Sequence, residues 1–322
     1  MAVSGSHPIV LIARRIPAVG AERIAERCEL REGGLGATPE RIGQLSRGVE
    51  AIVADPTVAV GPELLDAAGP GLSVVANFAV GYDNIDLAAC RARGVIATNT
   101  PDVLTDATAE LALALTLAAA RGLPTAERRL RDGEWTGFDT TGDLGIQLSG
   151  ATFGVVGLGR IGRRYAELVR PIAGAILYTA RSPQPEAEAA LGAKRADPER
   201  LLADSDVVSI HAAATAETTG LVGSRELALM RPGAILVNTA RGSLVDSAAL
   251  AAALTEGRIA AAGLDVYEDE PTVPAELLAA PNCVLLPHIG SATVTARDGM
   301  AGLVADSVLA VLDGREPPNR IV

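Results

Sequence analysis

The chain has 322 residues, of which 48% are apolar and 21% charged, and its formal net charge is −11. This length suits two hydrophobic cores, and the acidic balance argues against nucleic acid or an anionic membrane as a partner. Cys28, Cys90 and Cys283 are far apart and have no metal-ligand spacing, so reduced thiols, no metal and a cytoplasmic location are expected. The longest uncharged apolar stretch, residues 111–120, covers half of a membrane span, and the first apolar run is too short for a signal peptide.

Short apolar runs alternate with helical patterns along the first hundred residues. We predict strands over 9–13, 51–54 and 74–76, and helices over 18–28 and 85–93. Such βαβ alternation is typical of a parallel sheet covered by helices on both faces. The alternation breaks at Thr100-Pro101, after which an Ala- and Leu-rich stretch predicts one long helix over 103–121.

The βα alternation restarts at Ala151 and continues to the last helix. Predicted strands lie at 152–156, 175–179, 206–210, 234–238, 261–265 and 284–286, with helices at 161–169 and 293–312. A glycine signature that normally opens a nucleotide-binding domain lies here near mid-chain. We therefore expect an α/β fold with two Rossmann-like parallel-sheet domains. A dinucleotide-binding domain (residues 100–288) is inserted into a flavodoxin-like substrate-binding domain (residues 1–99 and 289–322).

The glycine signature, Gly157-Leu158-Gly159-Arg160-Ile161-Gly162, follows a predicted strand and opens a predicted helix. In this context Gly157 allows a tight turn, Gly159 lets the backbone approach a pyrophosphate, and Gly162 permits close packing of helix and strand. The helix N-terminus at Arg160 and Ile161 presents its backbone amides to the phosphates. The pattern predicts a dinucleotide cofactor bound by these residues.

The end of the second strand of this domain indicates which dinucleotide binds. An NAD enzyme usually has Asp or Glu there for the ribose hydroxyls, whereas this chain has Ala180, Arg181 and Ser182, with no carboxylate before Glu186. A guanidinium can hold a 2′-phosphate by a charge-assisted bond, and a serine can add a hydroxyl donor. We predict a preference for NADP(H) over NAD(H); the alternative is that Arg181 is solvated surface.

Three polar residues follow later strands of the same domain. Arg241, Glu270 and His288 each come after a predicted strand, and the carboxyl ends of such strands form the ligand crevice of open α/β sheets. Hydride transfer to a 2-oxo acid builds negative charge on the carbonyl oxygen, which a histidine can protonate. An arginine can hold the neighbouring carboxylate in a fork, and an acidic residue beside the histidine orients its ring. The three residues therefore predict such a reaction.

Nearby residues offer alternatives for these roles. Asp265, Glu268 and Asp269 compete for the place beside the catalytic histidine. Of the two remaining histidines, His7 lies near the N-terminus, where we expect it to be solvated. His211 ends a strand, and we expect it to pack against neighbours or to line the rim of the cofactor site.

Several motifs carry a family resemblance. They are Val80-Gly81-Tyr82-Asp83-Asn84-Ile85-Asp86, residues 100–110, Asn238-Thr239-Ala240-Arg241-Gly242, Asp269-Glu270-Pro271 and Pro287-His288-Ile289-Gly290-Ser291-Ala292-Thr293. Over about residues 53–311 the chain resembles D-isomer-specific 2-hydroxyacid dehydrogenases, and within them the glyoxylate/hydroxypyruvate reductases. One departure is Ala212-Ala213-Ala214, where the family often has a proline.

The resemblance implies a reductase of small 2-oxo acids, with glyoxylate and hydroxypyruvate as the first candidates. Arg241 would bind the substrate carboxylate and polarise the carbonyl. His288 would be the acid in reduction and the base in oxidation, and Glu270 would pair with it.

The resemblance also implies further site residues and an assembly. The backbone amides around Val80 and Gly81 would hold the substrate carboxylate, while Thr239 and Asp265 would belong to the cofactor site. A homodimer is expected.

Other functions occur on this scaffold. Phosphoglycerate dehydrogenase, phosphite dehydrogenase and enzymes for bulkier 2-oxo acids share it, although the missing acid at Ala180 argues against the first. The alternative to an enzyme is a binding protein that senses the cofactor, like the corepressors with this fold. The acidic chain, without extra docking segments, argues against that class.

Overall fold

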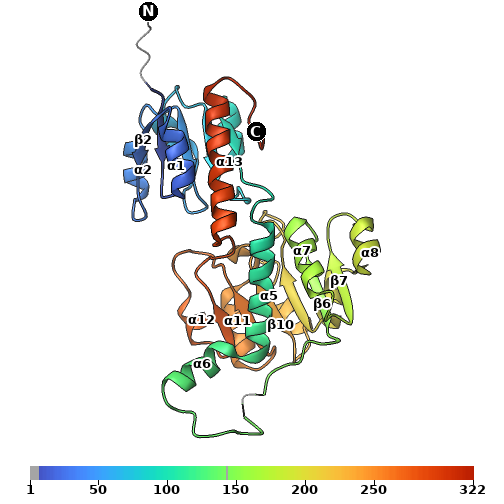
Figure 1. Ribbon diagram of the computed structural model, residues 1–322. Coiled ribbons are helices and arrows are strands. Elements are labelled where there is room, and N and C mark those ends of the chain that lie inside the picture. The colour runs from blue at the N-terminus through green and yellow to red at the C-terminus, as the bar shows by residue number, and fades with distance from the viewer. Residues whose placement is uncertain (1–6, 143) are drawn as a thin grey trace, which may run out of the picture. The chain divides into compact units, whose positions relative to one another are not determined.

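The computed structural model describes residues 7–142 and 144–322 and forms two compact α/β units (Figure 1). The first unit comprises the chain up to Leu104 together with Ser291–Val322, and the second comprises Thr105–Gly290. Each unit contains one sheet whose strands run parallel. The predicted fold class is therefore confirmed.

The sheet of the first unit has the order β2-β1-β3-β4-β5, which is the flavodoxin-like order. Its strands are β1 (Ile9–Ile12), β2 (Glu29–Glu32), β3 (Ala51–Ala54), β4 (Val74–Asn77) and β5 (Ile96–Thr98). Its helices are α1 (Ala18–Ala25), α2 (Pro39–Leu45), α3 (Pro62–Ala68), α4 (Leu87–Ala92) and α13 (Val294–Leu312). Strands β3 and β4 are buried along their whole length, which explains why they consist almost entirely of Ala, Val and Ile.

The sheet of the second unit has the order β12-β11-β10-β9-β6-β7-β8. Its strands are β6 (Thr152–Val156), β7 (Ala175–Thr179), β8 (Lys194–Arg195), β9 (Val207–Ile210), β10 (Ile235–Asn238), β11 (Ala261–Leu264) and β12 (Cys283–Leu285). Its helices are α5 (Thr105–Arg121), α6 (Leu123–Arg131), α7 (Arg160–Val169), α8 (Pro185–Leu191), α9 (Pro198–Asp204), α10 (Ser224–Leu229), α11 (Ser247–Thr255) and α12 (Ala275–Ala279). The strand order reverses between β6 and β9, which is the switch point where doubly wound folds bind ligands.

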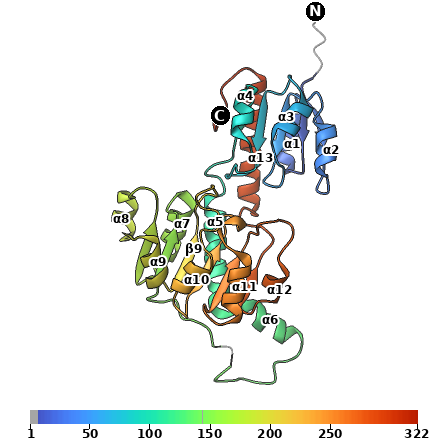
Figure 2. The same cartoon turned by 180° about the vertical axis from the view of Figure 1, so that it is seen from behind.

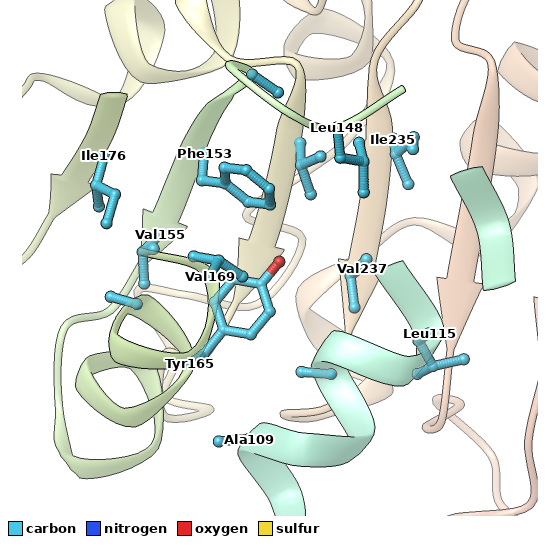
Figure 3. Close-up of a cluster of buried hydrophobic side chains, with 14 of the residues drawn as sticks. Ala109, Leu115, Leu148, Phe153, Val155, Tyr165, Val169, Ile176, Ile235 and Val237 are labelled. Atoms are coloured by element: carbon cyan, nitrogen blue, oxygen red, sulfur yellow. The ribbon is translucent and has the colours of Figure 1, made fainter. Parts of the chain in front are cut away.

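Helices cover both faces of this second sheet. Helices α5 and α7 lie on one face, and Figure 2 shows α9, α10 and α11 on the other. Figure 3 shows the core beneath α5 and α7, where Tyr165 of α7 points toward Phe153 of β6 and Val237 of β10. Leu115 of α5 lies against β11, where a Cβ on Gly263 would come within 3.0 Å of its side chain. Because the chain has so few aromatic residues, most of this core consists of Ala, Val, Leu and Ile.

The unit boundaries differ from the predicted ones at 99/100 and 288/289. Residues 100–104 stay with the first unit, where the Thr100 amide donates to the Ala79 carbonyl at 2.8 Å. Residues 289–290 stay with the second unit, where Asp265 binds both backbone amides. Because of these hydrogen bonds, each boundary between the units lies a few residues further along the chain than the sequence pattern predicts.

Gly20 provides a test of helix packing in the first unit, because a Cβ there would lie 2.7 Å from the carbonyl oxygen of Ala301 on α13. Gly20→Ala should push α1 and α13 apart and lower the free energy of unfolding by about 1–3 kcal/mol. The control is Gly302→Ala. Gly302 lies on α13 next to Ala301, and a Cβ there would meet nothing within 4 Å. That variant should gain about 0.5–1 kcal/mol from helix propensity. Urea denaturation measures both, and equal effects would contradict the close contact.

Candidate active site

The three predicted catalytic residues lie beyond the carboxyl ends of adjacent strands in the second unit. Arg241 follows β10, Glu270 follows β11, and His288 follows β12. Because these strands are parallel neighbours, the loops that carry the three side chains leave the same edge of the sheet.

Glu270 and His288 are joined by a hydrogen bond, with His288 Nδ1 at 2.6 Å from Glu270 Oε2. The other carboxylate oxygen, Oε1, accepts from the Tyr267 amide at 3.0 Å. Burial opposes ionisation of Glu270, but His288, the Tyr267 amide and the charge of Arg241 outweigh it, so the pKa of Glu270 is lowered. An ionised carboxylate only accepts hydrogen bonds, so Nδ1 carries a proton and Nε2 is left for a substrate.

Arg241 is held at the start of its loop by two hydrogen bonds. Its Nη1 donates to the Ala240 carbonyl at 2.8 Å, and its own carbonyl accepts from Asn238 Nδ2 at 2.8 Å. The next residue, Gly242, passes so close to the β11 loop that a Cβ would lie 1.9 Å from the carbonyl carbon of Tyr267. Only glycine fits this crossing, which brings the loop of Arg241 against the loop of Glu270.

Asp265 holds the backbone turn that carries His288. It is 1% exposed, and its two oxygens accept from the amides of Ile289 at 2.8 Å and Gly290 at 2.7 Å. The turn needs such support because His288 has a φ of 52°, in the left-handed region that L-residues rarely adopt. Burial raises the pKa of Asp265, while the Ile289 amide, the His288 charge and the Gly290 amide oppose this rise. Both oxygens are engaged by the turn, and a contact with the cofactor stays a prediction.

The glycine signature forms a cradle that suits a dinucleotide. Gly157 has a φ of 91° and lies against the His211–Ala212 backbone, while a Cβ on Gly162 would lie 2.1 Å from the Gly157 carbonyl oxygen. Gly159 faces open space and caps α7, which begins at Arg160 and has no acidic residue in its first turn. Close packing on one side and an open helix N-terminus on the other fit a pyrophosphate.

Other predicted cofactor residues lie on the neighbouring strand ends. Thr239 follows β10, and its Oγ1 is buried without a hydrogen-bond partner among the described residues, so a bound ligand could satisfy it. Ala180 follows β7 and is partly buried, whereas Arg181 and Ser182 are exposed. Hydrogen bonds from the Thr215 hydroxyl and the Glu217 backbone lower the pKa of Glu217, and the charge of Arg181 adds a smaller contribution.

The predicted carboxylate-binding loop lies in the first unit, after β4. The Val80 carbonyl accepts from Asn99 Nδ2 at 2.8 Å, and the Gly81 carbonyl accepts from Asn77 Nδ2 at 2.9 Å. The amides of Val80 and Gly81 have no partner within the described residues. The loop is thus fixed through its carbonyls, and its amides are available to an anion.

The other two histidines have different surroundings. His7 is exposed, with Nδ1 at 3.1 Å from the Arg27 carbonyl. The ring of His211 packs against Tyr165, and its Nε2 lies 2.8 Å from Ser209 Oγ. Burial lowers the pKa of His211 to about 3, so this ring is neutral at physiological pH. His211 therefore has a packing role beside the glycine signature.

Two features are absent from the described ranges, 7–142 and 144–322. No cluster of His, Cys, Asp and Glu there could hold a metal ion. No helix there is long and apolar enough to cross a membrane.

Sequence reasoning missed several residues that shape the site. The support that Asp265 gives to the His288 turn is not part of the prediction, which places Asp265 at the cofactor site, and that cofactor contact stays a prediction. Asn238 and Tyr267, which brace Arg241 and Glu270, were not predicted at all. A buried polar residue at the end of an apolar strand, as in Leu264-Asp265, is the signal that could have indicated such a brace.

A doubly wound sheet with this cradle at its switch point defines the second unit as the nucleotide-binding half of an NAD(P)-dependent dehydrogenase. Comparison with protein families identifies the group. The family "D-isomer specific 2-hydroxyacid dehydrogenase, NAD binding domain" matches residues 113–290. The chain belongs to the D-isomer specific 2-hydroxyacid dehydrogenases.

Relatives match along the whole chain. A glyoxylate reductase from Thermococcus litoralis is 46% identical over 320 residues, covering 98% of this chain and 96% of the relative. A crystal structure of a protein from Thermus thermophilus has a TM-score of 0.91 and 41% identity, covering 98% of this chain and all of that one. An NADPH-dependent glyoxylate/hydroxypyruvate reductase from Sinorhizobium meliloti, crystallised with NADP and malonate, has a TM-score of 0.88 and 37% identity. That match covers 98% of this chain and 97% of the reductase.

Asp265→Asn tests the support of the His288 turn. The variant keeps the side chain's size but places an NH₂ group against one of two backbone N–H donors, so one amide loses its acceptor. We expect the free energy of unfolding to fall by about 1–3 kcal/mol and amide hydrogen exchange at Ile289 and Gly290 to accelerate. The control is Asp269→Asn, at an exposed carboxylate of the β11 loop. Exchange no faster than in this control would contradict the role of Asp265.

Proposed function

We propose that the protein catalyses the NADPH-dependent reduction of small 2-oxo acids, glyoxylate and hydroxypyruvate first, to 2-hydroxy acids, with His288 as the general acid. The observation that carries the proposal is the contact between His288 Nδ1 and Glu270 Oε2 with Arg241 nearby. The names of the relatives support the choice of glyoxylate, and that of the Sinorhizobium meliloti enzyme supports hydroxypyruvate.

Each catalytic residue has one task in this proposal. When bound, the reduced nicotinamide supplies the hydride. Nε2 of His288 donates the proton to the carbonyl oxygen and recovers it in the reverse direction. Glu270 keeps the ring in the tautomer that presents Nε2, and its negative charge stabilises the imidazolium.

Three groups are assigned to the binding of the substrate carboxylate. The Arg241 guanidinium supplies a planar fork that matches a carboxylate. The amides of Val80 and Gly81 supply further donors without adding charge. In a 2-oxo acid the carboxylate and the carbonyl are bonded to each other, which is the spacing that an arginine beside a histidine serves.

The preference for NADPH is assigned to the end of β7. No carboxylate lies between Ala180 and Pro185, so nothing on that segment repels a 2′-phosphate. The exposed Arg181 and Ser182 supply a positive charge and a hydroxyl donor. The NADP bound to the Sinorhizobium meliloti relative supports this assignment, and NAD(H) is the alternative cofactor.

We further propose a homodimer that works in the cytoplasm. Large apolar side chains are exposed on α5, on α6 and on the segment that follows α6: Leu117, Leu123, Leu130, Trp135, Phe138 and Leu144. Phe138 is 90% exposed, and a group of this size on a surface marks an interaction site. A second copy of the chain is the occupant that the proposal assigns to this surface.

Initial rates across cofactors and acids test the reaction. NADPH and NADH oxidation are measured with glyoxylate, hydroxypyruvate, pyruvate and phenylpyruvate, and NADP reduction is measured with phosphite. The proposal expects NADPH with glyoxylate or hydroxypyruvate to give the highest kcat/KM. The highest value with phosphite or phenylpyruvate would overturn the assigned substrate class, and very slow turnover of every acid with tight cofactor binding would indicate a sensor.

His288→Gln tests the proton donor. We expect kcat for glyoxylate to fall by about 10²–10⁴-fold, the usual value of general acid catalysis, while the Kd for NADPH stays within about twofold. His7→Gln, at an exposed histidine, is the control and should leave both unchanged. Retained turnover in His288→Gln would mean that another group delivers the proton.

Arg181→Ala tests the cofactor assignment. Loss of a charge-assisted bond to the 2′-phosphate should raise the KM for NADPH roughly 10- to 100-fold and leave the KM for NADH nearly unchanged. Arg170→Ala removes an exposed arginine at the far end of α7 and serves as the control. Equal increases in KM for both cofactors would exclude a specific contact with the 2′-phosphate.

A further inference from the structure

The turn that follows β7 is braced from two sides. On one side, the Tyr178 hydroxyl accepts from the Gln184 amide at 2.8 Å and donates to the Glu188 carboxylate. On the other side, Nη2 of Arg195 donates to the Ala180 carbonyl at 3.0 Å and to the Arg181 carbonyl at 3.4 Å. The segment that carries Arg181 is therefore an exposed turn with a fixed backbone.

Arg195 reaches this turn because of the sheet register. Strand β8 pairs with β7 so that Arg195 lies opposite Tyr178, two residues before Ala180. The long side chain then extends in the strand direction to the carbonyls beyond the strand end. This edge pairing was absent from the predicted elements, so the sequence pattern did not connect Arg195 with the cofactor.

The contacts of Arg195 determine where the backbone donors of the turn point. In a trans peptide the C=O and the following N–H point in opposite directions. With the carbonyls of Ala180 and Arg181 directed at Arg195, the amides of Arg181 and Ser182 are directed away from it. Those two amides have no partner in the part of the chain that the structure describes. Successive free amides beside a cationic side chain form a binding site for an anion.

We propose that Arg195 is a positioning residue for cofactor selection. It fixes the Ala180–Ser182 turn so that two backbone amides, the Arg181 guanidinium and the Ser182 hydroxyl converge on the 2′-phosphate of NADPH. This inference rests on the NADPH preference proposed above and adds the residue that pre-organises the site. Pre-organisation raises affinity because the turn loses less conformational freedom on binding.

Glu217 is an exposed carboxylate that could attract the Arg181 side chain. Hydrogen bonds from the Thr215 hydroxyl and the Glu217 backbone lower the pKa of this carboxylate, and the charge of Arg181 adds a smaller contribution. A turn held by backbone contacts keeps its amides directed at the phosphate whichever anion Arg181 faces. The contacts of Arg195 therefore fix the backbone donors of the turn independently of where the Arg181 side chain points.

The test compares Arg195→Ala with Arg200→Ala. Both remove one exposed arginine of the same unit, but Arg200 bonds to Asp204 on its own helix, at 3.2 Å, and does not reach the turn. Calorimetry gives the Kd for NADPH, NADH and 2′,5′-ADP, and amide hydrogen exchange follows residues 179–184 in the absence of cofactor. In Arg195→Ala we expect the Kd for NADPH and 2′,5′-ADP to rise roughly tenfold, the Kd for NADH to stay within about twofold, and exchange in the turn to accelerate. Arg200→Ala should match the wild type.

The outcomes separate this inference from the proposed function. A wild-type enzyme that binds NADPH no more tightly than NADH would contradict the cofactor preference itself. A wild-type preference for NADPH that survives Arg195→Ala, or turn exchange that is unchanged in this variant, would overturn the role of Arg195 alone. Equal weakening of NADPH and NADH would overturn it as well, because the turn would then support the whole site rather than the 2′-phosphate.

Discussion

The hydrogen bond between His288 and Glu270 depends on a backbone turn that is unfavourable by itself. A non-glycine residue in the left-handed region costs roughly 1–2 kcal/mol, and His288 is such a residue. Asp265 offsets this cost, because its buried carboxylate accepts two amide hydrogen bonds from the residues that follow. Bonds to a charged group are worth roughly 1.5–3 kcal/mol each. The candidate acid is therefore oriented by two carboxylates: Glu270 binds its ring, and Asp265 binds its backbone.

Backbone contacts of the same kind hold the neighbouring loops. Gly242 allows the Arg241 loop to touch the Tyr267–Glu268 backbone, and the Tyr267 amide in turn binds Glu270. Positions of the three functional side chains are thus set by backbone contacts between loops that leave adjacent parallel strands. A scaffold of this kind limits where each group can move, which general acid catalysis and carboxylate recognition both require.

Much of the fold could be predicted from the sequence because its central strands are buried on both faces. Strands such as β3, β4 and β10 are short apolar runs between turn residues, and period and composition identify them. Edge strands lack this signal. Strand β2 reads Glu-Leu-Arg-Glu and β8 has only two residues, so neither differs from a loop in hydrophobic pattern. Because β8 is not predicted, the contact of Arg195 with the turn after β7 is not predicted either.

The catalytic residues of the candidate site could be predicted because each of them follows the end of a predicted strand. Arg241, Glu270 and His288 each follow an apolar run, and Glu270 rather than Glu268 or Asp269 contacts the histidine. What the sequence could not provide is the set of contacts between side chains and distant backbone atoms. Asp265 binds amides 24 and 25 residues away, and such pairings have no period or spacing that a reader of the sequence could recognise.

A crystal structure of the enzyme with NADPH and oxamate, an unreactive analogue of a 2-oxo acid, tests the central claim most directly. The account predicts Nε2 of His288 about 3 Å from the analogue's carbonyl oxygen, with the Nδ1–Glu270 bond intact and the Arg241 fork on the carboxylate. An oxamate carboxylate bound away from Arg241, or an imidazole turned away from the carbonyl, would contradict it.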